Sequence, residues 1–257
     1  MDIRFHGREA DQHEIEAYAG AVSLEGIARA ASIAAHYAAT GEVRFRGPYS
    51  SAIEFRFTTP EAGSLDFPLK AVSNLSKGAG RASKAIALFV ALLSRSTGQP
   101  IPEEAVDITS EIREGDLDAM AEGVSPGLWR AHRWIDDAEK RIEVTSNAAT
   151  VELNSRTKDY LEYEEQEDPS AQDVTVAAVN ANARTGRVWF ENLGRTIPFK
   201  VGKEANGRTL SNLARYLANH VEKTNDWVNI VFVPIRYSDG RLKRIIILDC
   251  ALASEMD

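Results

Sequence analysis

Apolar residues recur at steps of three and four along the stretch 15–37. This spacing keeps one face of an α-helix apolar and therefore predicts a long amphipathic helix. Asp11 can cap the start of the helical segment, and Gly41 is a typical stop. The stretch 23–26 favours a break into two helices, because serine prefers helix caps and Gly26 weakens a helix interior.

Alternation of apolar and polar residues predicts strands in the same part of the chain. Residues 42–46 and 52–57 alternate with a period of two. Further strands are expected over 2–6 and 64–69. Residues 82–140 show helical patterns, and 141–153 are expected to form a strand or a hairpin. This order predicts an α+β unit, an antiparallel sheet with long helices.

An acidic stretch then separates two parts of the chain. Residues 157–173 contain seven acidic residues, one lysine and a proline, a composition typical of a linker. We therefore place the domain boundary at about Pro169. The prediction is an α+β domain over 1–168, with a helical second half, and a smaller domain over 169–257.

The C-terminal part carries strand and turn signals in close succession. Strands are expected over 174–179, 187–191, 196–201, 227–237 and 242–249, and a helix over 209–222. Asp239-Gly240, between the last two strands, is a strong hairpin signal. The order β-β-β-α-β-β is that of an OB-type small β-barrel, a fold that often binds oligonucleotides. Other small barrels and α+β folds share this order.

The composition is that of a globular protein, with 44% hydrophobic and 26% charged residues in 257. One cysteine, Cys250, excludes a disulfide framework and a Cys-rich metal site. The first eleven residues lack the apolar core of a signal peptide. The longest nearly apolar run, Ala85–Leu93, is too short to span a membrane. We expect a cytoplasmic protein that does not bind membranes.

The net charge of −8 is unevenly distributed. Residues 174–252 contain twelve lysines and arginines against six acidic residues, so the rest of the chain is strongly acidic. A basic segment on an acidic protein can mark a nucleic-acid-binding surface. The alternative is that the two halves attract each other.

The strongest candidate for binding chemistry is the last predicted hairpin. Basic side chains around an aromatic ring suit a phosphate backbone and a stacked base. The hairpin residues in question are Arg236, Tyr237, Arg241, Lys243 and Arg244. Arg187 adds a further cation, and Trp189, Phe190 and Trp227 add aromatic surface. The alternative is an edge strand protected by charge, with the aromatic residues in the barrel core.

A glycine-rich stretch before an apolar helical run is a weaker candidate for phosphate binding. Its residues are Lys77, Gly78, Gly80, Arg81 and Lys84. The spacing lacks both GxxxxGK[ST] and GxGxxG, since Ser83 stands where the second pattern requires glycine. The remaining basis for phosphate binding is a helix N-terminus with cations nearby. The alternative is a flexible lead-in to a buried helix.

Catalytic and metal-binding motifs are not found in the sequence. The five histidines lack the HExxH spacing, and there is no GxSxG nucleophile motif. His132 lies between Trp129 and Trp134 and is expected to be packed or at the surface rather than a metal ligand. No cofactor or metal is expected.

Part of the chain resembles an uncharacterised bacterial family of two-domain proteins. The family pattern SLxGxxRxxxxxxHYxxTGEVR is matched by residues 23–44, and EAGSLDFPL at 61–69 is also similar. The resemblance covers about residues 2–70, with a weaker similarity in RYSDGRLKR at 236–244. It implies a bacterial origin. The sporadic occurrence of the family implies an accessory-genome or phage-defence role, and no catalytic residue follows from it.

Together these features predict a non-enzymatic bacterial binding protein whose basic barrel binds nucleic acid or a phosphate ligand. Its N-terminal domain is expected to assemble with itself or with a protein partner. Two alternatives belong to other classes. One is a scaffold subunit that assembles with itself or with a protein partner. The other is an enzyme that acts on a nucleotide through the stretch 77–84.

Overall fold

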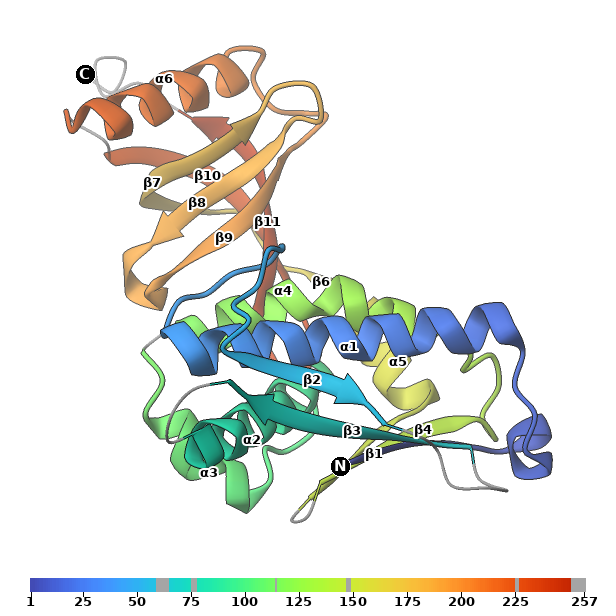
Figure 1. The fold of residues 1–257 in the computed structure, drawn as a ribbon. Coiled ribbons are helices and arrows are strands. Elements are labelled where there is room, and N and C mark those ends of the chain that lie inside the picture. Colours follow the sequence, from blue (N-terminus) through green and yellow to red (C-terminus); the bar gives the residue numbers. More distant parts are fainter. Residues whose placement is uncertain (59–64, 75–77, 114, 147–148, 225–226, 251–257) are drawn as a thin grey trace. The chain divides into compact units, whose positions relative to one another are not determined.

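A computed structural model describes the chain except for residues 59–64, 75–77, 114, 147–148, 225–226 and 251–257. The chain divides into two compact units, residues 1–162 and 163–257 (Figure 1). The second unit begins ahead of the predicted boundary at Pro169, because Glu165–Gln166 form a short strand, β6, that pairs with strand β10 of that unit. The predicted α+β class is confirmed.

The N-terminal unit contains an antiparallel five-stranded sheet in the order β2-β3-β1-β4-β5. The strands are β1 (Asp2–His6), β2 (Ile53–Phe57), β3 (Asp66–Ser73), β4 (Arg141–Thr145) and β5 (Thr150–Leu153). Alternation puts Ile3 and Phe5 into the core, whereas Arg4 points to the other face and forms an ion pair with Asp66. One face of this sheet is therefore apolar and the other is charged.

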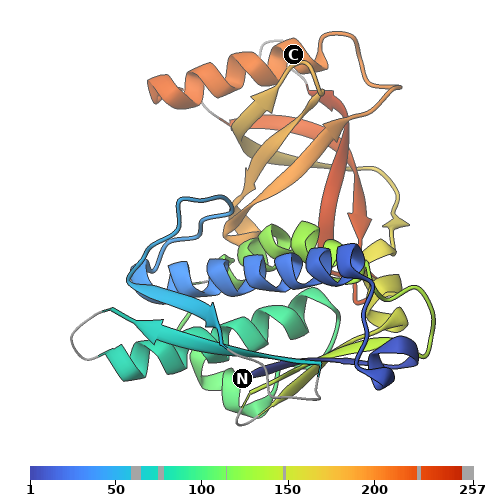
Figure 2. The ribbon, with the colours of Figure 1, turned by 45° about the vertical axis from the view of Figure 1, so that its right-hand side comes forward.

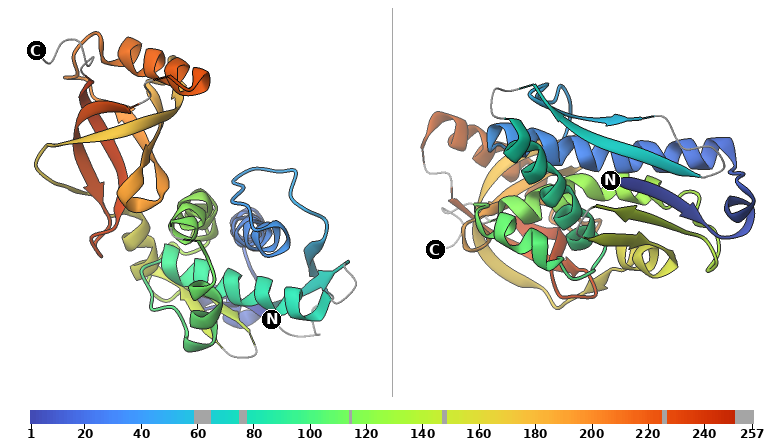
Figure 3. Two further views of the ribbon diagram at one scale, coloured as in Figure 1. Left: turned by 90° about the vertical axis from the view of Figure 1, so that its left-hand side faces the viewer. Right: turned by 60° about the horizontal axis from the view of Figure 1, so that its bottom comes forward.

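Helices cover the apolar face of the sheet. They are α1 (Ala17–Thr40), α2 (Gly78–Ser96), α3 (Glu103–Ser110), α4 (Asp116–Ala131) and α5 (Ser155–Glu162), preceded by the 3₁₀-helix η1 (Arg8–Gln12). Side chains from α1, α2 and α4 share one hydrophobic core with the sheet, in which Trp134 is 1% exposed. The left view of Figure 3 looks along α1 and α4, which lie side by side.

The predicted break in the first helix is wrong, because α1 is continuous from Ala17 to Thr40. Gly26 lies where α1 and α4 touch: a Cβ atom there would be 2.1 Å from the carbonyl oxygen of Gly127. The glycine therefore allows close helix packing. Glu16, and not Asp11, caps the helix through the backbone N–H groups of Tyr18 and Ala19.

The predicted strand over 42–46 is also wrong. Phe45 packs on α4, since a Cβ atom at Gly123 would lie 2.3 Å from its ring. Arg29 donates a hydrogen bond to the carbonyl oxygen of Phe45, 3.2 Å away. Phe45 thus packs on a helix, and the Arg29 side chain holds the backbone of this stretch.

The C-terminal unit is a closed five-stranded barrel of the predicted OB-like kind. Its main elements are β7 (Ser170–Asn180), β8 (Thr185–Phe190), β9 (Arg195–Val201), α6 (Thr209–Glu222), β10 (Trp227–Arg236) and β11 (Leu242–Cys250). A short 3₁₀-helix, η2 (Glu191–Leu193), connects β8 to β9. The barrel closes because β11 pairs in parallel with β9 and antiparallel with β10, which itself pairs with β7. Figure 2 shows α6 across one end.

Candidate nucleic-acid interface

The basic hairpin joins β10 to β11 through a turn at Tyr237–Arg241. Gly240 adopts a φ of +82°, and the backbone N–H of Tyr237 donates to the carbonyl oxygen of Arg241 at 3.0 Å. Two cations lie over the Tyr237 ring: the Arg241 guanidinium carbon is 5.6 Å and the Lys243 ammonium 5.1 Å from its centroid. The fold therefore gathers the predicted cations around one aromatic side chain.

Each of the four predicted hairpin cations has an acidic partner in the described part of the chain. Arg241 pairs with Asp239 in the turn, at 2.7 Å. The other partners come from the segment 163–168, which includes β6. Glu164 lies 2.6 Å from Arg244 and 3.2 Å from Lys243.

Glu167 is the second acidic residue of this segment that contacts the hairpin, and its carboxylate lies 2.7 Å from Arg236. The Tyr163 carbonyl oxygen also accepts a hydrogen bond from the Lys243 ammonium, at 3.1 Å. Sequence reasoning treated this segment as a linker and so missed both glutamates. The available signal was an acidic run in a chain whose C-terminal part is basic.

The Glu164 carboxylate is held in its charged form. Burial by itself would raise the pKa of Glu164, but hydrogen bonds and charge from Arg244 and Lys243 outweigh it and leave the pKa lowered. The ion pairs with the hairpin consequently persist at neutral pH.

Two tryptophans stand on the outer face of the barrel. Trp227 pairs with Thr175, and Thr175 pairs with Trp189 on the next strand. Residues that pair across strands point to the same face, so both indoles lie on one side, about two strand spacings or ~10 Å apart. Trp189 is 38% and Trp227 43% exposed. Phe190 points inward, is 2% exposed and packs against Phe232.

Arg187 lies one outward position from Trp189 on β8. Its Nε donates to Thr196 Oγ1 at 2.9 Å, and its Nη2 to the Thr196 carbonyl oxygen at 3.0 Å. Thr196 is also the residue that pairs with Trp189. A cation and an indole are therefore held together on the outer face of β8 and β9.

The start of β9 lies next to the hairpin. Arg195, the residue before Thr196, donates from Nη2 to the carbonyl oxygen of Leu242 at 2.9 Å, and Leu242 is the first residue of β11. The second and third strands and the last loop are the parts of an OB-type barrel that bind oligonucleotides. Arg187 and Trp189 lie on the second strand, and Tyr237 and Arg241 lie in the last loop. Arg236, Lys243 and Arg244 lie on the two strands that this loop joins.

The glycine-rich candidate has a different setting. Gly78, Gly80, Arg81 and Lys84 belong to the first turns of α2, and Lys77 lies outside the described residues. The Lys84 ammonium is 2.8 Å from Glu111. The structure therefore places these glycines in a helix rather than in a phosphate-binding loop.

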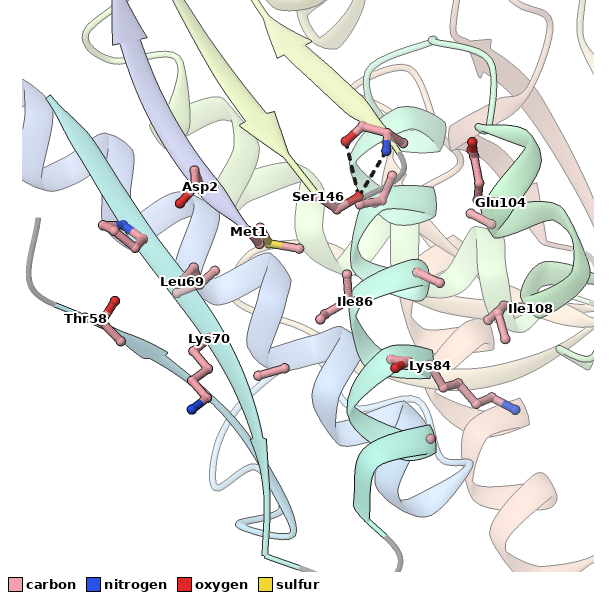
Figure 4. Close-up of a pocket in the computed structure, with 18 residues that line it drawn as sticks. Met1, Asp2, Thr58, Leu69, Lys70, Lys84, Ile86, Glu104, Ile108 and Ser146 are labelled. Atoms are coloured by element: carbon pink, nitrogen blue, oxygen red, sulfur yellow. Dashed lines mark hydrogen bonds between the residues drawn. The ribbon is translucent and has the colours of Figure 1, made fainter. Parts of the chain in front are cut away.

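A pocket of about 680 Å³ lies between α2, α3 and the sheet (Figure 4). Gly80 and Lys84 line it, beside apolar side chains that include Leu69, Ile86 and Ile108. Its lining is mostly apolar, which suits an apolar ligand better than a phosphate group.

Two side chains of potentially reactive type, Cys250 and His132, are buried. Burial raises the pKa of the Cys250 thiol to about 12, helped by the charge of Asp249, so the thiol stays protonated. His132 is 1% exposed, and its ring nitrogens lie 2.7 Å from the Leu128 carbonyl oxygen and 2.8 Å from Thr157 Oγ1. Among the described residues, no group of three or more His, Cys, Asp or Glu side chains is arranged to hold a metal ion.

A search of the described helices for membrane-spanning segments finds none of sufficient length and apolarity. Neither a curated protein nor a solved structure matches the chain. Two family models do match. A family of unknown function (DUF7947) matches residues 168–251, the barrel. A domain of unknown function (DUF7946) matches residues 1–162, more than half of the sequence, and the chain belongs to that family.

Proposed function

We propose that the barrel binds single-stranded nucleic acid across the outer face formed by β10, β7, β8 and β9. Trp189 and Trp227 stack on bases, Arg187 contacts a phosphate group, and the hairpin 236–244 extends the contact to further phosphates. The observation that carries the proposal is the pair of exposed indoles on one sheet face that leads to a cationic hairpin. Indole stacking needs unpaired bases, which favours single strands over a duplex.

Alanine substitution of the two tryptophans tests the proposal. Because base stacking on an aromatic side chain contributes about 1–3 kcal/mol, Trp189→Ala and Trp227→Ala should each weaken binding by roughly 10-fold, and the double variant by roughly 100-fold. The measurement is fluorescence anisotropy of labelled 15-nucleotide DNA and RNA single strands at fixed salt.

Trp129→Ala is the matched control, because Trp129 is 55% exposed on α4 of the other unit. It should bind as the wild type does. Equal affinity of the wild type and the double variant would show that the indole face is not the site. Binding of duplex as tightly as single strands would contradict the stacking mode.

Arg187→Ala should weaken binding to all sequences alike. Loss of one phosphate contact reduces the slope of log K against log salt by about 0.7 for a single strand. Anisotropy titrations at several salt concentrations measure that slope. An unchanged slope would remove Arg187 from the interface.

The cellular compartment and the biological role are part of the same proposal. Nucleic-acid binding and one buried thiol suit a reducing bacterial cytoplasm, and a role in phage defence rests on the resemblance in the N-terminal segment. Neighbouring genes of a defence operon would support that role. The scaffold alternative predicts oligomers that retain no oligonucleotide, which light scattering beside the anisotropy assay distinguishes.

A further inference from the structure

The acidic segment 163–168 lies on the hairpin as a ligand would. Glu164 places one carboxylate between Lys243 and Arg244, and Glu167 places another on Arg236. Carboxylate and phosphate groups accept hydrogen bonds from arginine with similar geometry. The two glutamates therefore mark two positions on the hairpin where an anionic oxygen is favoured.

The attachment of this segment is slight. Strand β6 contains only Glu165 and Gln166, which pair with Arg236 and Ile235 at the end of β10. One further backbone hydrogen bond joins the Glu167 N–H to the Pro234 carbonyl oxygen, at 3.2 Å. All residues from 162 to 171 are exposed. Surface ion pairs contribute little free energy each. A ligand with several phosphate groups can thus replace the segment without exposing a core.

We infer that Glu164 and Glu167 occupy two phosphate subsites of the hairpin, so that the segment 163–168 competes with the nucleic-acid backbone for Arg236, Lys243 and Arg244. The inference rests on the proposed function. A nucleic-acid strand that crosses the two tryptophans gains its contacts with the hairpin only as the Glu164 and Glu167 carboxylates leave. The segment therefore lowers the affinity of the barrel and the salt dependence of binding.

The opposite view is that the segment is a permanent clasp that stabilises the barrel. The two views differ in what removal of the carboxylates does. A competitor lowers affinity as long as it is present, whereas a clasp only adds stability.

Charge removal within the segment tests the inference in the full chain. Glu164→Gln with Glu167→Gln removes the two carboxylates that contact the hairpin. The matched control is Glu165→Gln with Asp168→Asn, which removes the same charge from the same six residues. The Glu165 carboxylate accepts a hydrogen bond from the Tyr163 hydroxyl at 3.3 Å.

The probes are labelled dT15 and rU15, titrated by anisotropy at several salt concentrations. The Glu164/Glu167 variant should bind roughly 5-fold tighter than the control, and its slope of log K against log salt should be steeper by about 1.4, since two phosphate contacts are gained. Thermal unfolding measurements show whether the barrel is folded in both double variants.

The outcomes separate the inference from the proposed function. If the wild type binds and the two double variants have equal affinities and slopes, the inference is overturned and the proposed function stands. If the Glu164/Glu167 variant binds more weakly than the control, the segment supports the site rather than competes for it, which also overturns the inference. If neither the wild type nor any variant binds the probes, the proposed function fails and the inference with it.

Discussion

Gly26→Ala is expected to lower the free energy of unfolding of the N-terminal unit by about 3 kcal/mol. The new Cβ atom would lie 2.1 Å from the Gly127 carbonyl oxygen and 2.7 Å from the Ala131 nitrogen. Both are backbone atoms, so no side-chain rotation removes the clash, and α1 and α4 must move apart. The higher helix propensity of alanine, about 1 kcal/mol, offsets only part of the cost.

Calorimetry of the full chain measures this effect as a fall of about 6–12 °C in the melting temperature of the N-terminal unit. Gly80→Ala is the matched control, because Gly80 lies in α2 and a Cβ atom there would contact nothing within 4 Å. It should leave the unit unchanged or slightly stabilised. If both variants melt alike, the contact between α1 and α4 is not as close as the structure shows.

Protonation of His132 should destabilise the same unit at acidic pH. Burial is the main cause that lowers the pKa of His132, from 6.5 to about 4, so the folded unit requires the neutral imidazole. The unfolded chain binds the proton first as the pH falls below 6.5. Stability is therefore lost progressively between pH 6.5 and pH 4, by roughly 2–3 kcal/mol at pH 4.5 relative to pH 7.

Carboxylates also titrate in this range, so the test is a comparison of urea unfolding at pH 7 and pH 4.5 in three proteins. His132→Gln should be less stable than the wild type at pH 7, but should lose roughly 2–3 kcal/mol less on acidification. His13→Asn replaces an exposed histidine in a left-handed conformation that asparagine tolerates, and should behave as the wild type does. Equal losses in the wild type and the His132 variant would contradict the prediction.

The barrel was the most predictable part of the fold. Alternation with a period of two, the Asp239-Gly240 turn and the amphipathic stretch 209–222 are local signals, and they predict the element order that the structure shows. Whether each aromatic side chain of the barrel is exposed or buried was less predictable. Trp189 points outward and Phe190 inward because they are neighbours on one strand, and strand register decides which of them meets the core.

In the N-terminal unit, the predictions that failed concern helices that touch other helices. Pro126 is typical of a helix start, yet it lies in the interior of α4. Burial of Met120, Val124 and Leu128 offsets the cost of proline in a helix interior, about 3 kcal/mol. Such compensation depends on neighbours that are distant in the sequence.

The α+β class, the β-β-β-α-β-β order of the C-terminal unit and the clustering of cations in its last hairpin can all be predicted from the amino-acid sequence. These depend on local periodicity, turn chemistry and charge. The shared face of Trp189 and Trp227 is visible only in the folded chain, and so are the ion pairs of Glu164 and Glu167 with the hairpin. Both facts follow from strand pairs and ion pairs between residues 14 or more positions apart in the sequence. No local pattern specifies which distant strand, or which acidic residue, becomes the neighbour.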